Sequence, residues 1–312
     1  MITELSAEAK EFGQQALRAF EAAGGDELIQ RAEADPAARE ALTGKVLAEL
    51  GAWDLEPRSD SDSLEAAAAL CRSAGYWALP YPVAERLSRP TDVDAEGLIV
   101  VSDTRPAAAI SGIDIDWAAV TLDGRRSKVS GMTSVEPAFV SHLDLTPLDE
   151  SGRGDVALAL VLPCWTLLGM LDRALALTIA HVQSRHQFGQ PLSGFQSVQF
   201  QLTDGEVERA GLEMLAKYAL WSVGEVRPEA VDDALALRMA ALEAAEVVFR
   251  VTHQLHGAVG FCDETTLSWL SRYSQPLRRL PFGLSATRDV LTRRIGRTGL
   301  TGLFSTDRAT VS

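Results

Sequence analysis

The sequence predicts a mainly α-helical protein that carries a small β domain in the middle of the chain. Apolar residues recur at helical spacing up to about residue 90, give way to short β-like runs, and return to helical spacing from residue 165 onward. We therefore expect an N-terminal helical domain over 1–94, a reduced β domain over 95–163, and a C-terminal four- or five-helix bundle over 164–312.

Three helices are expected in the first region. The first begins after Ser6, a good N-cap residue, and ends before Gly24. The second opens at Asp35-Pro36, since a capping residue followed by proline is typical of a helix start. The third extends from Leu64 to about Trp77, ahead of two prolines.

The middle region carries short runs rich in apolar and β-branched residues, separated by turn residues. Asp123-Gly124 is a hairpin turn signal between two of them. The runs predicted as strands cover residues 98–101, 107–110, 117–122, 143–148 and 156–162.

The helical period dominates from Trp165 to the end. Residues 171–182 place their apolar side chains on one face of a helix of about 20 residues. The segment Pro228–Gly257 has apolar stripes on two faces, which indicates a helix buried between layers. Further bundle helices are expected over 198–223, 265–273 and 284–295.

Composition excludes several classes of partner. The 43 acidic residues outnumber the 29 basic ones and give a net charge of -14, which would repel nucleic acid and anionic membranes. Three scattered cysteines predict neither a disulfide framework nor a metal site. The longest apolar run, 156–170, is too short to cross a bilayer, and no secretory signal is apparent, so we expect a cytoplasmic protein.

Two motifs at the ends of predicted bundle helices carry the functional signal. The first is Arg-His-Gln-Phe-Gly-Gln-Pro-Leu over 185–192, followed by Phe-Gln at 195–196. The second is Gln-Leu-His-Gly over 254–257, followed by Gly-Phe at 260–261. Together, and in this spacing, the motifs resemble the flavin-contacting edge of the acyl-CoA dehydrogenase family. The resemblance is strong over about 171–289 and thinner elsewhere.

The resemblance implies an acyl-CoA dehydrogenase-like fold and a set of FAD contacts made in trans, across a subunit interface. A guanidinium group binds phosphate through forked donors, an aromatic side chain offers a stacking face, and glycine lets a backbone approach phosphate closely. The alternative is that each glycine merely ends a helix and that the arginine is a solvated cation. The candidate cofactor-binding residues are Arg185, Gln187, Phe188, Gln196, Gln254, Gly257 and Gly260.

The general base of such an enzyme is missing. Its usual position aligns with Pro281-Phe282-Gly283, and a less common position falls near Ala159-Leu160; neither holds a carboxylate. The nearest acids, Asp155 and Asp172, are expected to be surface or capping residues. No counterpart of the family's ring-holding loops is found over 95–163, which predicts that this chain's own flavin pocket is incomplete. We therefore assign no catalytic residue and no metal ligand.

Two further charged features are left open. Glu246 and His253 share a face of one helix and are either a functional couple or, for the acid, a partner of a neighbouring arginine. Seven arginines between 272 and 297 face either cofactor phosphates or, as the preferred interpretation, acidic residues at a subunit interface.

A chain that keeps trans-acting flavin contacts but lacks the base is expected to be one subunit of a heteromer. The resemblance implies an α2β2 assembly with a full-length acyl-CoA dehydrogenase homologue, an FAD shared with that partner, and α,β-dehydrogenation of an acyl-CoA, by analogy a bulky steroid side-chain thioester. The alternatives are a self-sufficient homo-oligomeric flavoenzyme with a displaced base and a flavin-free scaffold subunit.

Overall fold

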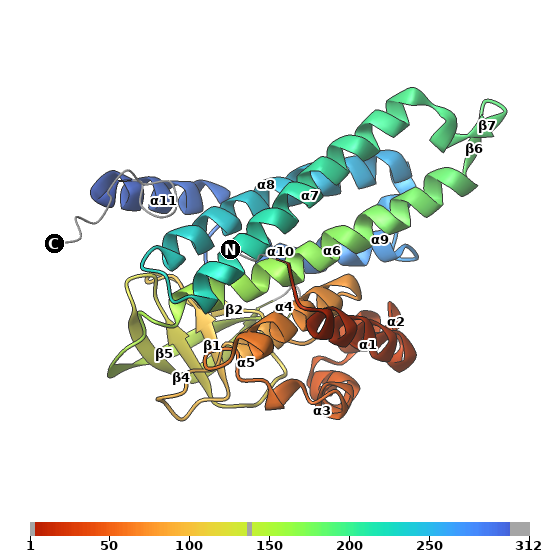
Figure 1. The fold of residues 1–312 in the computed structure, drawn as a ribbon. Helices are drawn as coiled ribbons and strands as arrows, with labels where there is room; N and C mark the ends of the chain where they lie inside the picture. Colours follow the sequence, from red (N-terminus) through yellow and green to blue (C-terminus); the bar gives the residue numbers. More distant parts are fainter. Residues whose placement is uncertain (1–3, 136–138, 300–312) are drawn as a thin grey trace.

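The computed structural model describes residues 4–135 and 139–299, and it confirms a mainly helical protein with one small sheet. The N-terminal helices and the sheet lie side by side beneath a bundle of long helices (Figure 1). How the chain divides into domains remains a prediction, because one hydrophobic core runs through all three regions.

The N-terminal region contains α1 (Ala7–Ala23), α2 (Glu27–Ala34), α3 (Lys45–Glu49), α4 (Ser61–Tyr76) and α5 (Val83–Leu87). The Ser6 cap is confirmed, since its hydroxyl accepts from the Ala9 amide at 3.3 Å. The helix expected from Asp35-Pro36 is instead broken into a 3-10 turn, a π turn and the short α3. In that segment the Arg39 side chain is buried against loop carbonyls of distant segments, so tertiary contacts override the local helical period.

The sheet has the strand order β1-β3-β4-β5-β2. Its strands are β1 (Gly97–Val100), β2 (Ala107–Ala108), β3 (Trp117–Val120), β4 (Arg125–Val135) and β5 (Val140–Ser151). β1 pairs with β3 in parallel, and the other pairs are antiparallel. The expected turn at Asp123-Gly124 joins β3 to β4. No local pattern predicted β4, because its residues are mostly polar and exposed.

The strand predicted over 156–162 is wrong. These residues form the first two turns of α6 (Val156–Ser184), a helix of 29 residues that contains Pro163 in its interior. A short apolar run fits a buried strand and a buried helix equally well, and the proline pointed to a break. Tertiary packing favours the helix, because this part of α6 lies in the centre of the molecule and its residues are buried on nearly every side.

The bundle is formed by α6, α7 (Gln196–Gly224), α8 (Ala230–His256), α9 (Thr266–Tyr273), α10 (Gln275–Arg279) and α11 (Leu284–Thr298). Consecutive long helices run antiparallel along its axis (Figure 1). The prediction that α8 is buried on two faces is confirmed, since Leu235 and Leu242 on one face and Leu237 and Val248 on the other are all buried.

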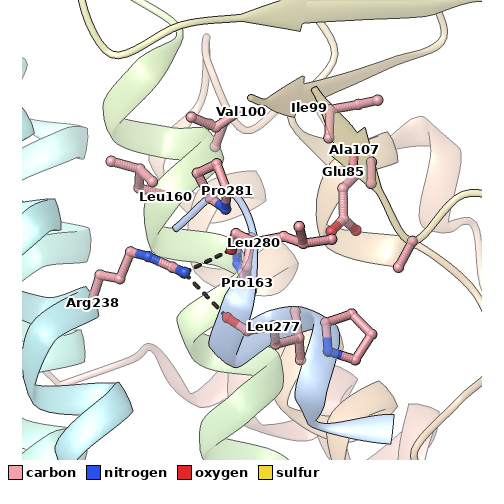
Figure 2. A pocket seen from close by; sticks show the side chains of 14 residues that line it. Glu85, Ile99, Val100, Ala107, Leu160, Pro163, Arg238, Leu277, Leu280 and Pro281 are labelled. Atoms are coloured by element: carbon pink, nitrogen blue, oxygen red, sulfur yellow. Dashed lines mark hydrogen bonds between the residues drawn. The ribbon is translucent and has the colours of Figure 1, made fainter. Parts of the chain in front are cut away.

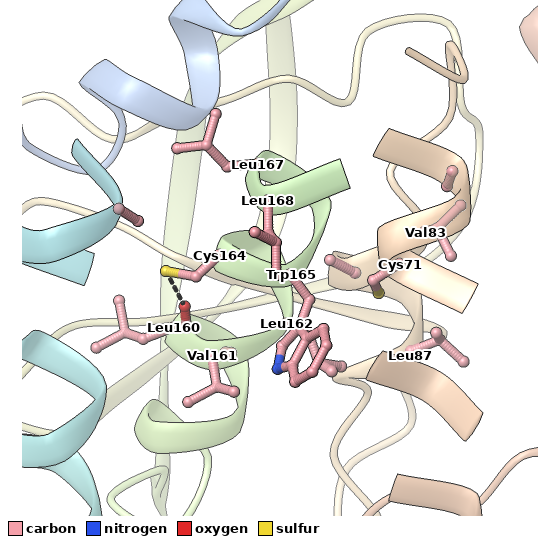
Figure 3. Close-up of a cluster of buried hydrophobic side chains, with 14 of the residues drawn as sticks. Cys71, Val83, Leu87, Leu160, Val161, Leu162, Cys164, Trp165, Leu167 and Leu168 are labelled. Carbon is pink, nitrogen blue, oxygen red and sulfur yellow. Dashed lines mark hydrogen bonds between the residues drawn. The ribbon is translucent and has the colours of Figure 1, made fainter. Parts of the chain in front are cut away.

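The crossing of α4 and α6 joins the N-terminal helices to the bundle. A Cβ atom on Gly75 would lie 1.9 Å from the Thr166 carbonyl oxygen, and one on Gly169 would lie 1.9 Å from that of Arg72. The two backbones can therefore touch only because both positions are glycine. Figure 3 shows the core beside this crossing, where Trp165 of α6 packs toward Cys71 of α4 and Val83 of α5.

One helix in the described part of the chain, α6, is long and apolar enough to cross a membrane by length and composition. In its most apolar 18-residue window, 78% of the residues are buried inside the protein, as in the core helix of a bundle.

Candidate functional site

The segment between α6 and α7 is a β-hairpin that projects from one end of the bundle (Figure 1). Its strands are β6 (His186–Gln187) and β7 (Gln190–Pro191), and the two turn residues are Phe188 and Gly189. Both have positive φ, 52° and 82°, as a two-residue type I′ turn requires. Gly189 is thus a hairpin glycine, and the alternative that it ends the preceding helix is wrong, because α6 ends at Ser184.

Phe188 is unfavourable both in its backbone conformation and in the exposure of its side chain. Its left-handed backbone is strained for a residue with a Cβ atom. Its ring is 92% exposed and meets only the edge of Phe195, at 6.3 Å between ring centroids. An exposed aromatic ring on a strained turn favours contact with a ligand or another chain.

The structure brings the seven sequence-predicted residues to this same end of the bundle. Arg185 caps α6, Gln196 opens α7, and Gln254 lies in the last turn of α8. All of the candidates except Gly260 are exposed. In the described part of the chain, no hydrogen bond or ion pair joins the side chains of Arg185 and these two glutamines to other residues.

A small apolar cluster separate from the main core fixes the three helix ends relative to one another. Its buried members are Val182 of α6, Val198 of α7, and Val251 and Leu255 of α8. Beside it, the rings of His181 and His256 stack at 4.3 Å, which ties α6 to α8. Burial lowers the pKa of both histidines and favours the neutral rings that can stack without repulsion.

An open groove of about 560 Å³ runs along the C-terminal half of α8. Gln254 and Gly257 lie on its wall, and space is open beyond Gly257, where a Cβ atom would meet nothing within 4 Å. Gly257 also ends α8 with a φ of 63°, which confirms the helix-ending role, and its predicted contact with a cofactor stays a prediction. Gly260 is buried, and a Cβ atom there would lie 2.9 Å from that of His256, so it is required for packing rather than for ligand approach.

Glu246 and His253 both line this groove, but they do not form a couple. The His253 ring stacks on Phe261 at 4.3 Å, and its buried Nδ1 atom has no hydrogen-bond partner among the described residues. Glu246 instead interacts electrostatically with Arg278. The Arg278 guanidinium lies 5.5 Å from the centroid of the Phe249 ring. The groove thus presents a half-buried guanidinium and an exposed aromatic ring.

Some of the seven arginines near the C-terminus form ion pairs with acidic residues of the same chain. Arg272 pairs with Asp263 at 2.8 Å, and Arg288 pairs with Glu243 at 2.9 Å. The acidic partners that we expected at a subunit interface are therefore partly intramolecular.

A small cavity lies between the loop after α10 and the first turns of α6, beside the two segments where the resemblance places a general base (Figure 2). Leu280 and Pro281 line it from the loop, and Ala159 and Leu160 line it from α6. Its volume is about 50 Å³. Phe282, the middle residue of the usual base segment, does not line the cavity.

Arg238 of α8 holds the loop at this cavity. Its guanidinium donates to the carbonyl oxygens of Leu280 at 2.6 Å, Phe282 at 2.8 Å and Leu277 at 3.3 Å. The side chain is 97% buried, since its relative exposure is 3%, and no carboxylate lies within 4 Å of it among the described residues. Burial lowers the pKa of Arg238. Backbone dipoles therefore stabilise its charge and fix the loop.

Sequence analysis missed one carboxyl group that does line this cavity, that of Glu85 on α5. Glu85 is far from both motifs in sequence and sits in a five-residue helix that the sequence did not predict. No local pattern signals its position, because only the packing of α5 against β1 and α6 brings it there.

Asp155 and Asp172 are neither bases nor surface or capping residues, which corrects our expectation. Asp155 forms a buried ion pair with Arg126 and another with Arg58 at 3.0 Å, and its side chain does not cap α6. Asp172 pairs with Arg72 at 2.7 Å. Both carboxylates are occupied by arginines and are unavailable for proton transfer.

Comparison with known proteins agrees with this architecture. Residues 161–297 match the family model described as acyl-CoA dehydrogenase, C-terminal domain. Among solved structures, the ChsE4-ChsE5 complex from Mycobacterium tuberculosis aligns with a TM-score of 0.71 at 17% identity and covers 97% of this chain and 100% of that one. A variant of the Tcur3481-Tcur3483 steroid ACAD aligns with a TM-score of 0.75 at 18% identity, covering 95% and 99%. The chain has the fold of an acyl-CoA dehydrogenase.

The sequence similarity to curated acyl-CoA dehydrogenases is confined to part of the chain. FadE27 from Mycobacterium tuberculosis is 33% identical over 139 residues, which is 42% of this chain and 36% of the relative. FadE28 from the same organism is 33% identical over 132 residues, or 42% and 38%. The matched part thus spans little more than a third of these acyl-CoA dehydrogenases.

Proposed function

We propose that this chain is a subunit of a heteromeric, FAD-dependent acyl-CoA dehydrogenase, in which it completes the partner's flavin site and lacks a catalytic base of its own. The observation that carries the proposal is the bundle end, where a strained, exposed Phe188 and unpaired Arg185, Gln187, Gln196 and Gln254 point away from this chain. These exposed polar groups are hydrated in the isolated chain and are available to bind another molecule.

The bundle end suits a phosphate-bearing, partly aromatic cofactor such as FAD. Arg185 offers forked donors for phosphate, and Phe188 offers a ring face. The groove beside Gly257 supplies Arg278 and the exposed ring of Phe261. These groups would hold and orient the cofactor from the side opposite to the partner's own contacts.

When bound, FAD would supply hydride acceptance for α,β-dehydrogenation of an acyl-CoA. The α-proton would go to the partner's carboxylate, because neither segment where the family places its base, 281–283 or 159–160, holds a carboxylate in this chain. This chain would therefore act by binding and positioning.

The partner in this proposal is a full-length acyl-CoA dehydrogenase homologue in an α2β2 assembly. Support comes from the fold similarity to the ChsE4-ChsE5 complex and to the Tcur3481-Tcur3483 steroid ACAD, both named as two-component proteins. By the same analogy the substrate would be a CoA thioester with a bulky steroid side chain, handled in the cytoplasm.

Co-expression with such a homologue, followed by measurement of flavin per protein mass, tests the proposal. One FAD per heterodimer is expected, and Arg185→Ala should weaken FAD binding by roughly tenfold or more, as loss of a charged hydrogen bond does. Arg105→Ala is the matched control, because it removes the same charge from an exposed loop of the β region. Stoichiometric FAD and acyl-CoA oxidation by the chain alone would refute the heteromer.

A second candidate is a self-sufficient flavoenzyme with a displaced base, and the position of Glu85 favours it. Glu85 lines the small cavity together with Pro281 and Leu160, which belong to the two segments where the family places its base. In that case the chain purified alone would bind FAD, and an acyl-CoA would bleach the flavin absorbance under anaerobic conditions. Glu85→Gln would abolish that bleaching while leaving FAD content unchanged.

A further inference from the structure

Three apolar side chains form an exposed stripe along α7. Phe200, Val207 and Met214 are 59%, 63% and 58% exposed, and they follow one another at intervals of seven residues. Residues seven apart lie on the same face of a helix, two turns from each other. Between Val207 and Met214 this face carries the small residues Ala210 and Gly211, and a Cβ atom on Gly211 would meet nothing within 4 Å. The face is thus apolar and open.

The opposite face of α7 is also apolar and packs on the rest of the bundle. Val198, Leu212 and Ala216 are buried there, on the side that meets α6 and α8. A helix that is apolar on both faces is normally buried between layers, as α8 is. In α7 the described residues of this chain cover only one of the two apolar faces. The pattern therefore indicates a further layer outside α7.

The exposed charged side chains of α7 are all acidic: Asp204, Glu206 and Glu208. The basic residues of this helix are engaged within the chain. Arg209 pairs with Glu206 at 2.7 Å, and Lys217 is buried and pairs with acidic residues of this chain. In a seam of seven-residue spacing, Asp204 and Glu206 occupy the flanking positions, whose charges select the partner helix. Any helix that docks on the stripe therefore meets carboxylates along its edges.

These charges decide between the possible occupants of the face. A second copy of α7 would bring carboxylates against carboxylates in either helix direction, and like charges at an interface cost affinity. An anionic membrane surface would be repelled for the same reason. A helix with an apolar stripe of the same spacing and with lysine or arginine at its flanks would gain both apolar burial and pairs of opposite charge.

We propose that the outer face of α7 is the docking site for a helix of the partner subunit, in which an apolar stripe is flanked by basic residues. The inference rests on the proposed function and deepens it, because it names a second surface through which this chain binds the full-length homologue. Of the seven cofactor candidates, only Gln196 belongs to α7. Phe200 follows it by one turn, so the docking face continues from the bundle end without sharing its cofactor contacts.

Assembly of the co-expressed chain and homologue, measured by analytical ultracentrifugation at pH 7, tests the charge argument. Asp204→Lys/Glu208→Lys should weaken association roughly tenfold or more at about 0.05 M salt and much less at about 0.5 M, because salt screens exposed charges. Neither side chain forms a hydrogen bond or ion pair with the described residues, so the fold should be unaffected. Glu8→Lys/Glu21→Lys is the matched control, since it reverses two exposed acids on α1 and should leave association unchanged.

Val207→Gln/Met214→Gln tests the apolar part of the contact. Association should weaken roughly tenfold or more at both salt concentrations, because burial of apolar surface does not depend on charge screening. Both side chains are mostly exposed, so the chain alone should keep the unfolding temperature of the parent. Met132→Gln, at an exposed position of β4, is the control and should have no effect on assembly.

The chain alone should sediment as a monomer at micromolar concentration. Self-association that Asp204→Lys/Glu208→Lys strengthens would assign the face to a second copy and overturn the proposal. A complex that forms equally well with both α7 variants would overturn it too. If that complex still holds one FAD per heterodimer, the heteromer stands and only the assignment of α7 fails. Absence of any complex with the unaltered chain would overturn both proposals.

Discussion

Single charged side chains stabilise this protein according to what surrounds them. Glu213 of α7 accepts from Arg209 at 2.7 Å and from Arg72 at 3.2 Å, and it also pairs with Lys217 at 3.0 Å. Burial alone would raise its pKa, but these donors lower it to about 2. Glu85 shows the opposite case, because burial raises its pKa, and only a hydrogen bond from its own backbone amide and the charge of Arg39 act against that effect. The same residue type is thus held in its charged form in one place and shifted toward its neutral form in the other.

Glu213→Gln should lower the free energy of unfolding by about 2 kcal/mol at pH 7, since it breaks a half-buried ion network that joins α4 to α7. The folded pKa of Glu213 is below its unfolded value, so this contribution is present above pH ~4.5 and is lost as pH falls toward 2. Urea unfolding of both proteins between pH 7 and 3 should show the difference shrinking.

Glu208→Gln is the control on the same helix, because Glu208 is exposed. It should change stability by less than about 0.5 kcal/mol. A constant difference across the whole pH range for Glu213→Gln would contradict the assignment of its low pKa.

Among the secondary-structure elements, α6 determines most of the architecture. It packs against α4, α7 and α8, and its N-terminal turns form the floor of the cavity beside Glu85. Its close approach to α4 depends on glycine at two positions, and its far end presents the hairpin β6-β7. One helix therefore connects the internal cavity to the exposed bundle end.

Gly169→Ala should destabilise the protein by about 3 kcal/mol or more, because the new methyl group would overlap the Arg72 carbonyl and force α4 and α6 apart. Gly211→Ala is the matched control within a helix, since a Cβ atom there would meet nothing within 4 Å. It should stabilise by up to about 1 kcal/mol through helix propensity. Chemical denaturation of both variants measures the contrast, and equal effects would contradict the close crossing.

Phe188→Asn should separate stability from cofactor binding in the hairpin. Asn-Gly is the preferred pair for a type I′ turn, so the variant should be more stable by about 0.5–1 kcal/mol than the parent chain. If Phe188 contacts FAD in the assembly, the co-expressed complex should at the same time lose flavin. Thermal unfolding of the chain alone and flavin content of the complex give the two readings; a stable variant with full flavin would exclude Phe188 from the cofactor site.

At the scale of the whole molecule, one continuous core links the N-terminal helices, the sheet and the bundle. The helix α6 crosses the boundary expected at 163/164, so the buried side chains on its first turns belong to the same core as those of the bundle. A chain built in this way should unfold as one unit rather than region by region.

Thermal unfolding should therefore give coincident transitions by near-UV and far-UV circular dichroism, although the tryptophans are distributed over all three regions. The fragment 164–312, expressed alone, should be unfolded or aggregated, because it lacks the first turns of α6 and exposes the surface that packs on α4. A soluble fragment with a cooperative transition of its own would show that the bundle is an independent domain.

The sequence alone determined the features that depend on local pattern: the cap at Ser6, the two-faced burial of α8, and the motifs that identify the bundle end. Those features follow from helical period and turn chemistry, which neighbouring residues define by themselves. Tertiary structure decided the rest. It made a helix of 156–162, paired Asp155 and Asp172 with distant arginines, and brought Glu85 to the cavity beside Leu160 and Pro281. These outcomes rest on contacts between residues far apart in sequence, and no local pattern encodes which of them will meet.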